Sequence, residues 1–226
     1  CEPLQDTVRQ DERELLEQYF ARKFREGGGT VAPALGEAAH TLFVNMKNQI
    51  MIDRQGAKTD CADFIRKHLT EALQKDYQQA KQSGQPFRSD LQIRYDRGTT
   101  TEAMRLYLCT VKEVYQQLRR EVAAELGTTD EAALDKAFPI LVTFAEPKQY
   151  KKIVVDATEK LPLEVTLLAS GQSKTLKNFS LDELRKEMNS FRPGKSDMTI
   201  SLKVDKDIPM GVVQDVKEEL RKGFKY

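Results

Sequence analysis

The sequence predicts an α+β protein with two similar modules, each a small, mainly antiparallel sheet covered by two helices on one face, preceded by an N-terminal amphipathic helix. Two observations lead to this prediction. Short segments alternate apolar and polar residues, as half-buried strands do, and segments with apolar residues at helical spacing separate them. The order hairpin, helix, alternating strand, acidic–basic turn and helix also occurs twice along the 226 residues. A repeated order of elements indicates a duplicated module.

The composition excludes several classes of protein. There are 36 Lys and Arg and 35 Asp and Glu, so the formal net charge of +1 gives no reason to expect nucleic acid or an anionic membrane as the main partner. No apolar run approaches the roughly 18 residues that a membrane span needs. Two His and three Cys are too few for a protein-built zinc site or a disulfide framework. A single bridge between Cys61 and Cys109 stays open. Cys1 is either a lipid-modified N-terminus or the point at which a longer chain was cut.

The amphipathic helix is predicted within residues 1–26. Its apolar residues recur at helical spacing, namely Leu15, Leu16, Tyr19, Phe20 and Phe24. Three glycines end the helix, and residues 27–39, with Pro33 and small side chains, are predicted to be a linker. The helix either docks on the next domain as a surface element or serves as a connector or self-association helix.

The first module is predicted over residues 40–147. It begins with a hairpin, because two apolar runs flank the pair Lys47-Asn48. A helix follows over residues 60–73, and the Gln- and Lys-rich residues 74–88 are predicted to be its tail and a loop. Residues 91–95 then alternate as a half-buried strand that ends at Asp96.

The rest of the first module contains two helices and two strands. Two Thr-x-x-Glu patterns have the spacing of a capping box, and they predict the starts of a long helix and a short one: Thr99 with Glu102, and Thr128 with Glu131. The apolar runs 140–144 and 153–155 are typical of strands.

The second module is predicted over residues 148–226. Residues 163–168 and 175–176 form a hairpin around Gly171, and Ser180 with Glu183 is a third capping box. Residues 198–204 alternate as a strand. Pro209 suits the first turn of the last helix, whose buried face is predicted from four residues at helical spacing: Val212, Val213, Val216 and Leu220.

No catalytic, cofactor-binding or metal-ligating motif stands out, which indicates a binding or interaction module and not an enzyme. Cys61 and His68 are seven positions apart, which favours a buried pair over a catalytic one. His40 is predicted to be solvated in a linker. The most site-like segment is the turn after Asp96, but Asp96 ends a strand, Gly98 turns the chain and Thr99 caps a helix, so its structural role suffices.

Four segments of the second module carry a family resemblance. They are a first strand at 163–167, the helix start Phe179–Leu184, the run Met198–Pro209, in which a strand leads through Asp-Lys-Asp-x-Pro into a helix, and the helical segment Val212–Phe224. Over residues 161–226 the chain resembles the periplasmic domain of the ExbD/TolR family of biopolymer-transport proteins. The first module looks like a diverged second instance, closest to ExbD-like proteins with an enlarged periplasmic region.

The resemblance implies a function. ExbD/TolR proteins have one transmembrane helix and a periplasmic domain, and they assemble with an ExbB/TolQ-like proton channel protein to drive TonB or TolA. It therefore implies an ExbD-like subunit of a proton-motive-force-driven complex that energises transport across the outer membrane, single-pass in the cell inner membrane, with this region in the periplasm. Its partners would be the channel protein, a TonB/TolA-like protein and a second copy, as a homodimer. The proton-carrying Asp of the family lies in the membrane helix, which these residues do not contain.

The alternative is a TolR-like or lipid-anchored periplasmic module that binds peptidoglycan or protein. In either case the residues expected to contact a partner follow the strand 198–204, and they are Asp205, Lys206, Asp207 and Pro209. We expect an extended partner segment to pair with a strand edge beside this turn, with weak dependence on salt. Cofactors are not expected.

Overall fold

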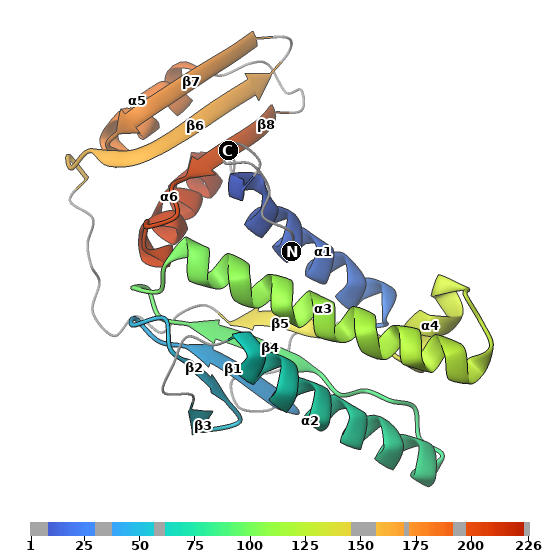
Figure 1. The fold of residues 1–226 in the computed structure, drawn as a ribbon. Coiled ribbons are helices and arrows are strands. Elements are labelled where there is room, and N and C mark those ends of the chain that lie inside the picture. Colours follow the sequence, from blue (N-terminus) through green and yellow to red (C-terminus); the bar gives the residue numbers. More distant parts are fainter. Residues whose placement is uncertain are drawn as a thin grey trace. The chain divides into compact units, whose positions relative to one another are not determined.

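The computed structural model describes residues 9–29, 38–56, 62–145, 157–169, 172–191 and 198–223. Over these residues the protein is α+β, with six helices and two small sheets (Figure 1). The chain divides into two units, Cys1–Lys148 and Gln149–Tyr226. Within the described residues, every helix is too short or too polar to cross a bilayer.

The first unit contains a mixed five-stranded sheet in the order β3-β2-β1-β4-β5. Its strands are β1 (His40–Val44), β2 (Ile50–Ile52), β3 (Gln55–Gly56), β4 (Leu91–Tyr95) and β5 (Val142–Ala145). β1, β2 and β3 form an antiparallel meander, so the predicted hairpin is confirmed. β4 is parallel to β1, and β5 is parallel to β4. The prediction of a mainly antiparallel sheet is therefore wrong for this unit, because helical connections before β4 and β5 are long enough to return the chain for parallel pairing.

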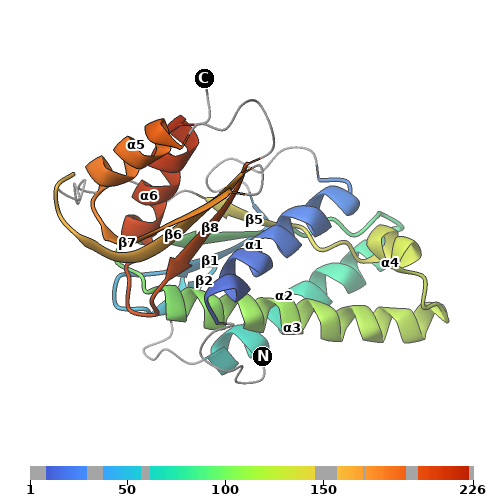
Figure 2. The same ribbon diagram turned by 90° about the horizontal axis from the view of Figure 1, so that it is seen from above.

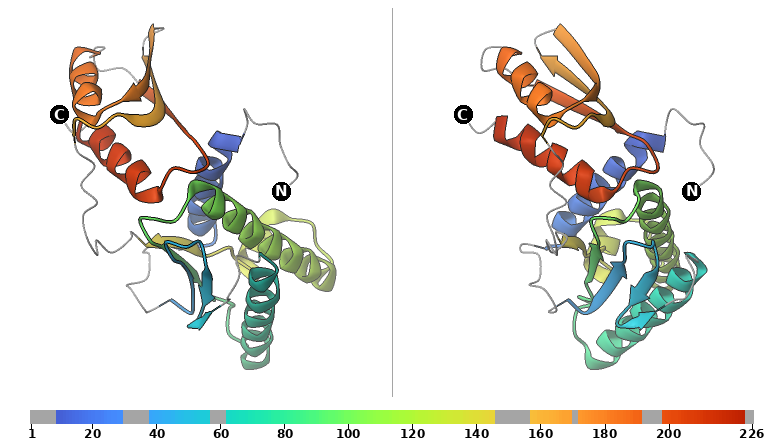
Figure 3. Two further views of the ribbon diagram at one scale, coloured as in Figure 1. Left: turned by 60° about the vertical axis from the view of Figure 1, so that its left-hand side comes forward. Right: turned by 90° about the vertical axis from the view of Figure 1, so that its left-hand side faces the viewer.

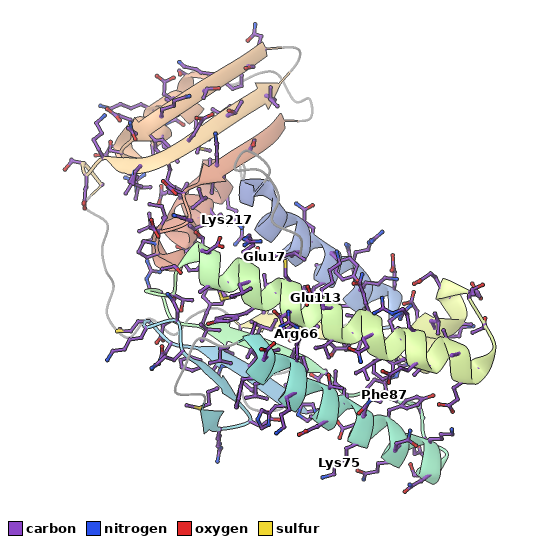
Figure 4. The ribbon with its side chains drawn as sticks, in the orientation of Figure 1. Glu17, Arg66, Lys75, Phe87, Glu113 and Lys217 are labelled. Atoms are coloured by element: carbon purple, nitrogen blue, oxygen red, sulfur yellow. The ribbon has the colours of Figure 1, made fainter. Side chains whose placement is uncertain are left out.

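Two long helices, α2 (Ala62–Ser83) and α3 (Thr101–Leu126), lie side by side on one face of this sheet (Figure 3). Arg66 of α2 reaches Glu113 of α3, with Nη2 and Oε2 3.0 Å apart (Figure 4). The sheet residues of one face are buried, and they are Leu42, Val44, Ile50, Ile52, Leu91, Ile93, Tyr95 and Val142. Apolar burial between the helices and this face holds the unit together.

Helix α2 continues to Ser83, which confirms the predicted helix tail after residue 73. Its buried residues are Ile65, Leu69 and Leu73, and none follows Leu73. Gln, Lys and Ala favour a helix without an apolar stripe, so periodicity ends before the helix does. Near its end, the ring of Tyr77 meets Phe87 and Phe138 edge-on.

The N-terminal helix α1 (Arg9–Glu26) packs against α3 and β5 within the first unit (Figure 2). Leu16 and Phe20 are buried, and the ring centroid of Phe20 lies 6.3 Å from that of Phe144. The helix ends at the glycines, as predicted, and Gly28 has a φ of +82° in the left-handed region that favours glycine.

Two of the three predicted caps are displaced. The cap of α3 is Thr100, whose side chain accepts from the amide of Ala103, while Thr99 is fully buried. Asp130, and not Thr128, caps α4 (Glu131–Ala137). In both places several residues with capping side chains adjoin, so spacing alone does not select one. The Ser180–Glu183 capping box is confirmed, and it opens α5 (Leu181–Ser190).

The second unit contains a three-stranded antiparallel sheet in the order β7-β6-β8, as predicted for its sheet type. Its strands are β6 (Leu161–Ala169), β7 (Gln172–Phe179) and β8 (Met198–Val204). Helices α5 and α6 (Met210–Gly223) lie on one face of it (Figure 3). The predicted buried face of α6 is confirmed for Val213, Val216 and Leu220, which belong to the same core as β6 and β8, and Val212 is half-buried against that core.

The two units share the order hairpin, helix, strand, helix, but their sheets differ in direction. β4 runs parallel to the first hairpin strand, β1, whereas β8 runs antiparallel to β6. The short strand β3 accounts for this: the chain reverses once more before α2, so the next strand returns in the direction of β1. In the second unit the hairpin leads from β7 directly into α5. A duplicated module is therefore not confirmed.

Some predictions fall on residues outside those described, namely the strand at 153–155, the Gly171 turn and the side chain of Cys61. Cys109 is buried and disulfide-bonded. The sequence leaves a bridge between Cys109 and Cys61 open, and Cys61 lies outside the described residues.

Candidate partner-binding edge

Within the described residues, the outer side of β8 is one of the two unpaired edges of the second sheet. β8 pairs with β6 in an unbroken register from Ala169–Met198 to Leu163–Val204, and in the part of the chain that the structure describes no strand pairs with its other side. A strand edge presents backbone N–H and C=O groups that a further strand can bind. The geometry is therefore that of a docking edge for an extended peptide.

Side chains on β8 leave this edge accessible. Leu202 and Val204 point into the core and are buried, whereas Ser201 and Lys203 between them are exposed. The alternation anchors the strand to the core through one face and leaves small or flexible side chains on the other.

The opposite edge, β7, is less suited to pairing. Its register with β6 is interrupted between Leu161 and Glu164. It also carries Lys174, paired with Glu187 of α5, and Lys177, whose Nζ lies 3.0 Å from Glu164. Lysines are one device by which proteins block edge-to-edge pairing, and β7 carries two of them where β8 carries one, Lys203.

The turn after β8 brings together the four residues predicted to contact a partner. Asp205, Lys206 and Asp207 are exposed, and Pro209 is half-buried. The amide of Ile208 donates to the carbonyl of Asp205 at 3.2 Å, which closes the turn. The carbonyl of Pro209 accepts from Val212 and Val213, so Pro209 precedes the helix, one position earlier than predicted.

A turn of the same local form follows β4. There the amide of Thr99 donates to the carbonyl of Asp96 at 3.0 Å. The hairpin loop covers this turn, because Asp96 Oδ2 accepts from the amide of Met46 at 3.1 Å and Thr99 Oγ1 donates to the carbonyls of Val44 and Asn45. β4 is also paired on both sides. The turn after Asp96 is thus structural, whereas the turn after Asp205 lies at an open edge.

The sequence prediction for His40 is wrong. His40 begins β1, its side chain is 13% exposed, and it bridges two carboxylates: Nδ1 lies 2.6 Å from Asp53 Oδ2, and Nε2 lies 2.9 Å from Asp76 Oδ2. Ser89 Oγ donates to the same Asp76 oxygen at 2.5 Å. Burial lowers the pKa of His40, but the hydrogen bonds to Asp53 and Asp76 outweigh it and raise the pKa above its ordinary value.

This His40 cluster ties β1 to α2 and to the turn between β2 and β3. It borders a cavity of about 360 Å³ that His68, Glu71 and Lys75 also line; Figure 4 labels Lys75. Among the described residues there is no group of His, Cys, Asp or Glu side chains that could hold a metal ion. Sequence spacing gave no signal for the cluster, because its members are 13 and 36 positions from His40.

No protein-family model matches the chain, and neither the curated proteins nor the solved structures include a significant match.

Proposed function

We propose that this chain is the periplasmic part of an ExbD-like subunit of a proton-motive-force-driven complex that energises transport across the outer membrane. Its second unit acts by capturing an extended partner segment as an additional strand beside β8. The observation that carries the proposal is the unpaired outer side of β8 in the described structure, next to the exposed residues Asp205, Lys206 and Asp207. The resemblance over residues 161–226 supplies the candidate partners, a TonB/TolA-like protein and a second copy of the chain.

Two further features support the proposal. The formal net charge of +1 suits recognition through the backbone, which needs no net charge. The disulfide at Cys109 suits an oxidising compartment such as the periplasm, since cytosolic thiols are kept reduced. In this function the protein binds and positions its partner and carries no catalytic residue.

The test is site-specific crosslinking in the intact membrane complex. A photoreactive residue replaces Ser201 on β8 or, as a matched control, Ser173 on β7; both serines are exposed. We expect crosslinks from position 201 to the TonB-like protein or to a second copy, and few from position 173. Equal crosslinking from both positions, or crosslinks from neither, would contradict strand capture at β8.

The same experiment separates the family alternatives. Crosslinks to a TolA-like protein, together with retention of the chain on isolated peptidoglycan, would favour a TolR-like role over an ExbD-like one.

The dependence of crosslinking on salt is a second readout for strand capture at β8. Backbone pairing predicts that crosslinking changes little between low and physiological ionic strength.

A further inference from the structure

A groove in the first unit lies between α1, α3 and α4. It has a volume of about 530 Å³, and its polar lining includes Tyr19, Arg22, Gln116, Arg119 and Arg120. The proposed function uses β8 and its turn in the second unit and leaves this groove without a role. A ligand for the groove would therefore be independent of that function.

The floor of the groove is a cluster of paired charges, of which the Glu131 carboxylate is 70% exposed. Arg119, whose side chain is 7% exposed, donates to the carbonyl of Phe138 at 2.9 Å and pairs with Glu131 and Asp135, each at 2.8 Å. Lys23, 12% exposed, pairs with Glu26 at 2.9 Å and with the same two carboxylates at 3.3 Å. These buried cations are already compensated, so they shape the site and do not attract a ligand by themselves.

The rim carries further cations outside this cluster. Arg120 is exposed and forms no ion pair with the described residues. Arg22 is 60% exposed and forms a long ion pair, at 3.8 Å, with Glu26, a carboxylate that it shares with Lys23. Lys112 lies beside the groove, with its ammonium 4.8 Å from the centroid of the Tyr19 ring. The rim thus carries exposed cations on α1 and on α3, together with the exposed carboxylate of Glu131.

The arrangement of these donors suits an elongated ligand. Lys112, Gln116 and Arg120 are four positions apart along one face of α3, which spans about 12 Å at 1.5 Å per residue. An extended peptide rises about 3.3 Å per residue, so about four residues cover that distance. A small inorganic anion would occupy a minor part of the volume. The near-neutral chain and the few free cations argue against nucleic acid.

We infer that this groove binds a short extended acidic protein segment, with its carboxylates on Arg22 and Arg120 and its backbone near Gln116 and the Tyr19 ring. Arg forms paired hydrogen bonds with carboxylates, which makes it well suited to this role. Because exposed ion pairs are screened, binding falls as salt rises, in contrast to pairing at β8.

The test uses the full chain and an acetylated, amidated hexapeptide that carries two Glu residues three positions apart, with the Gln analogue as control. Fluorescence polarisation at low and physiological salt measures the affinity. We expect the Glu peptide to bind and the Gln analogue to bind at least tenfold more weakly. Arg22→Gln and Arg120→Gln each reduce the affinity about fivefold. Arg25→Gln, on α1 but outside the groove lining, leaves it unchanged.

Three outcomes would overturn the inference. They are equal binding of the Glu and Gln peptides, a loss in Arg25→Gln as large as in Arg120→Gln, and displacement of the peptide by an equal concentration of inorganic phosphate. The last result would make the groove a small-anion site. Circular dichroism of each variant checks that the fold is intact, and Arg120→Lys, which keeps the charge, is expected to recover part of the affinity.

Discussion

Nε2 of His40 lies 2.9 Å from Oδ2 of Asp76, so the first residue of β1 is joined to a residue 36 positions later, in the middle of α2. On its other side the same imidazole meets Asp53. One side chain thus holds a strand, a turn and a helix of the first unit through charge-assisted hydrogen bonds.

This cluster predicts a pH-dependent stability of the first unit. The pKa of His40 is raised above its ordinary 6.5, so its contribution is complete below about pH 6.5 and is lost as pH rises through the higher pKa of the folded state. Replacing His40 with Asn should lower the free energy of unfolding by about 1 kcal/mol at pH 6 and by less at pH 9, since the carboxylates are partly exposed. Urea unfolding across this pH range measures the difference. His68→Asn is the control, and an equal loss at both pH values would contradict the prediction.

The core of the second unit predicts a large cost for Val216→Asp. Val216 is fully buried among β6, β8 and α5 side chains, so an unpaired carboxylate there should cost about 3 kcal/mol or more. Thermal unfolding followed by circular dichroism should show a transition well below that of the unaltered protein. Gln214→Asp, at a half-buried position of the same helix, should change it little. An unchanged melting temperature for Val216→Asp would refute the packing of α6.

The capping box of α5 predicts a smaller effect. Ser180 Oγ accepts from the amide of Glu183, and the Glu183 carboxylate accepts from the amide of Ser180 at 3.0 Å. Ser180→Ala should therefore lower the stability of the second unit by about 1 kcal/mol. Ser190→Ala, at the other end of the helix, is the matched control. If the two variants unfold at the same denaturant concentration, the box contributes nothing.

The disulfide of Cys109 predicts sensitivity to reduction. Peptide mapping without reductant should join the Cys109 peptide to the Cys61 peptide, and Cys61→Ser should destabilise the first unit by about 2–4 kcal/mol. Cys1→Ser should leave both the map and the unfolding midpoint unchanged. A map that joins Cys109 to Cys1 would reverse the roles of the two variants.

Local signals predicted the second unit well and the first unit only in part. The strand 198–204 and the helix after Pro209 follow from alternation and helical spacing, which are properties of neighbouring residues. The direction of β4 depends on the two residues of β3, too short a segment to have a period. The run of three threonines at 99–101 offers several capping hydroxyls, and packing selects Thr100.

The candidate sites, too, could be predicted from the sequence only where they depend on neighbouring residues. Asp205, Lys206 and Asp207 were found because they are consecutive and follow a clear strand. The unpaired edge beside them depends on which strands become neighbours, which no local pattern determines. The His40 cluster and the groove between α1 and α3 bring together residues that are far apart in the chain, so only the fold reveals them.

The extra reversal at β3 has a consequence for anyone who searches for evolutionary kinship within this chain. A superposition that matches the hairpin β1–β2 to β6–β7 leaves β4 and β8 pointing in opposite directions. A superposition that matches each strand, its turn and the following helix inverts the hairpins instead. A rigid superposition of the two units can therefore match either their hairpins or their strand–turn–helix segments, but not both. Common ancestry of the two units would have to be traced segment by segment, with β3 treated as an insertion that reversed the direction of the strand that follows.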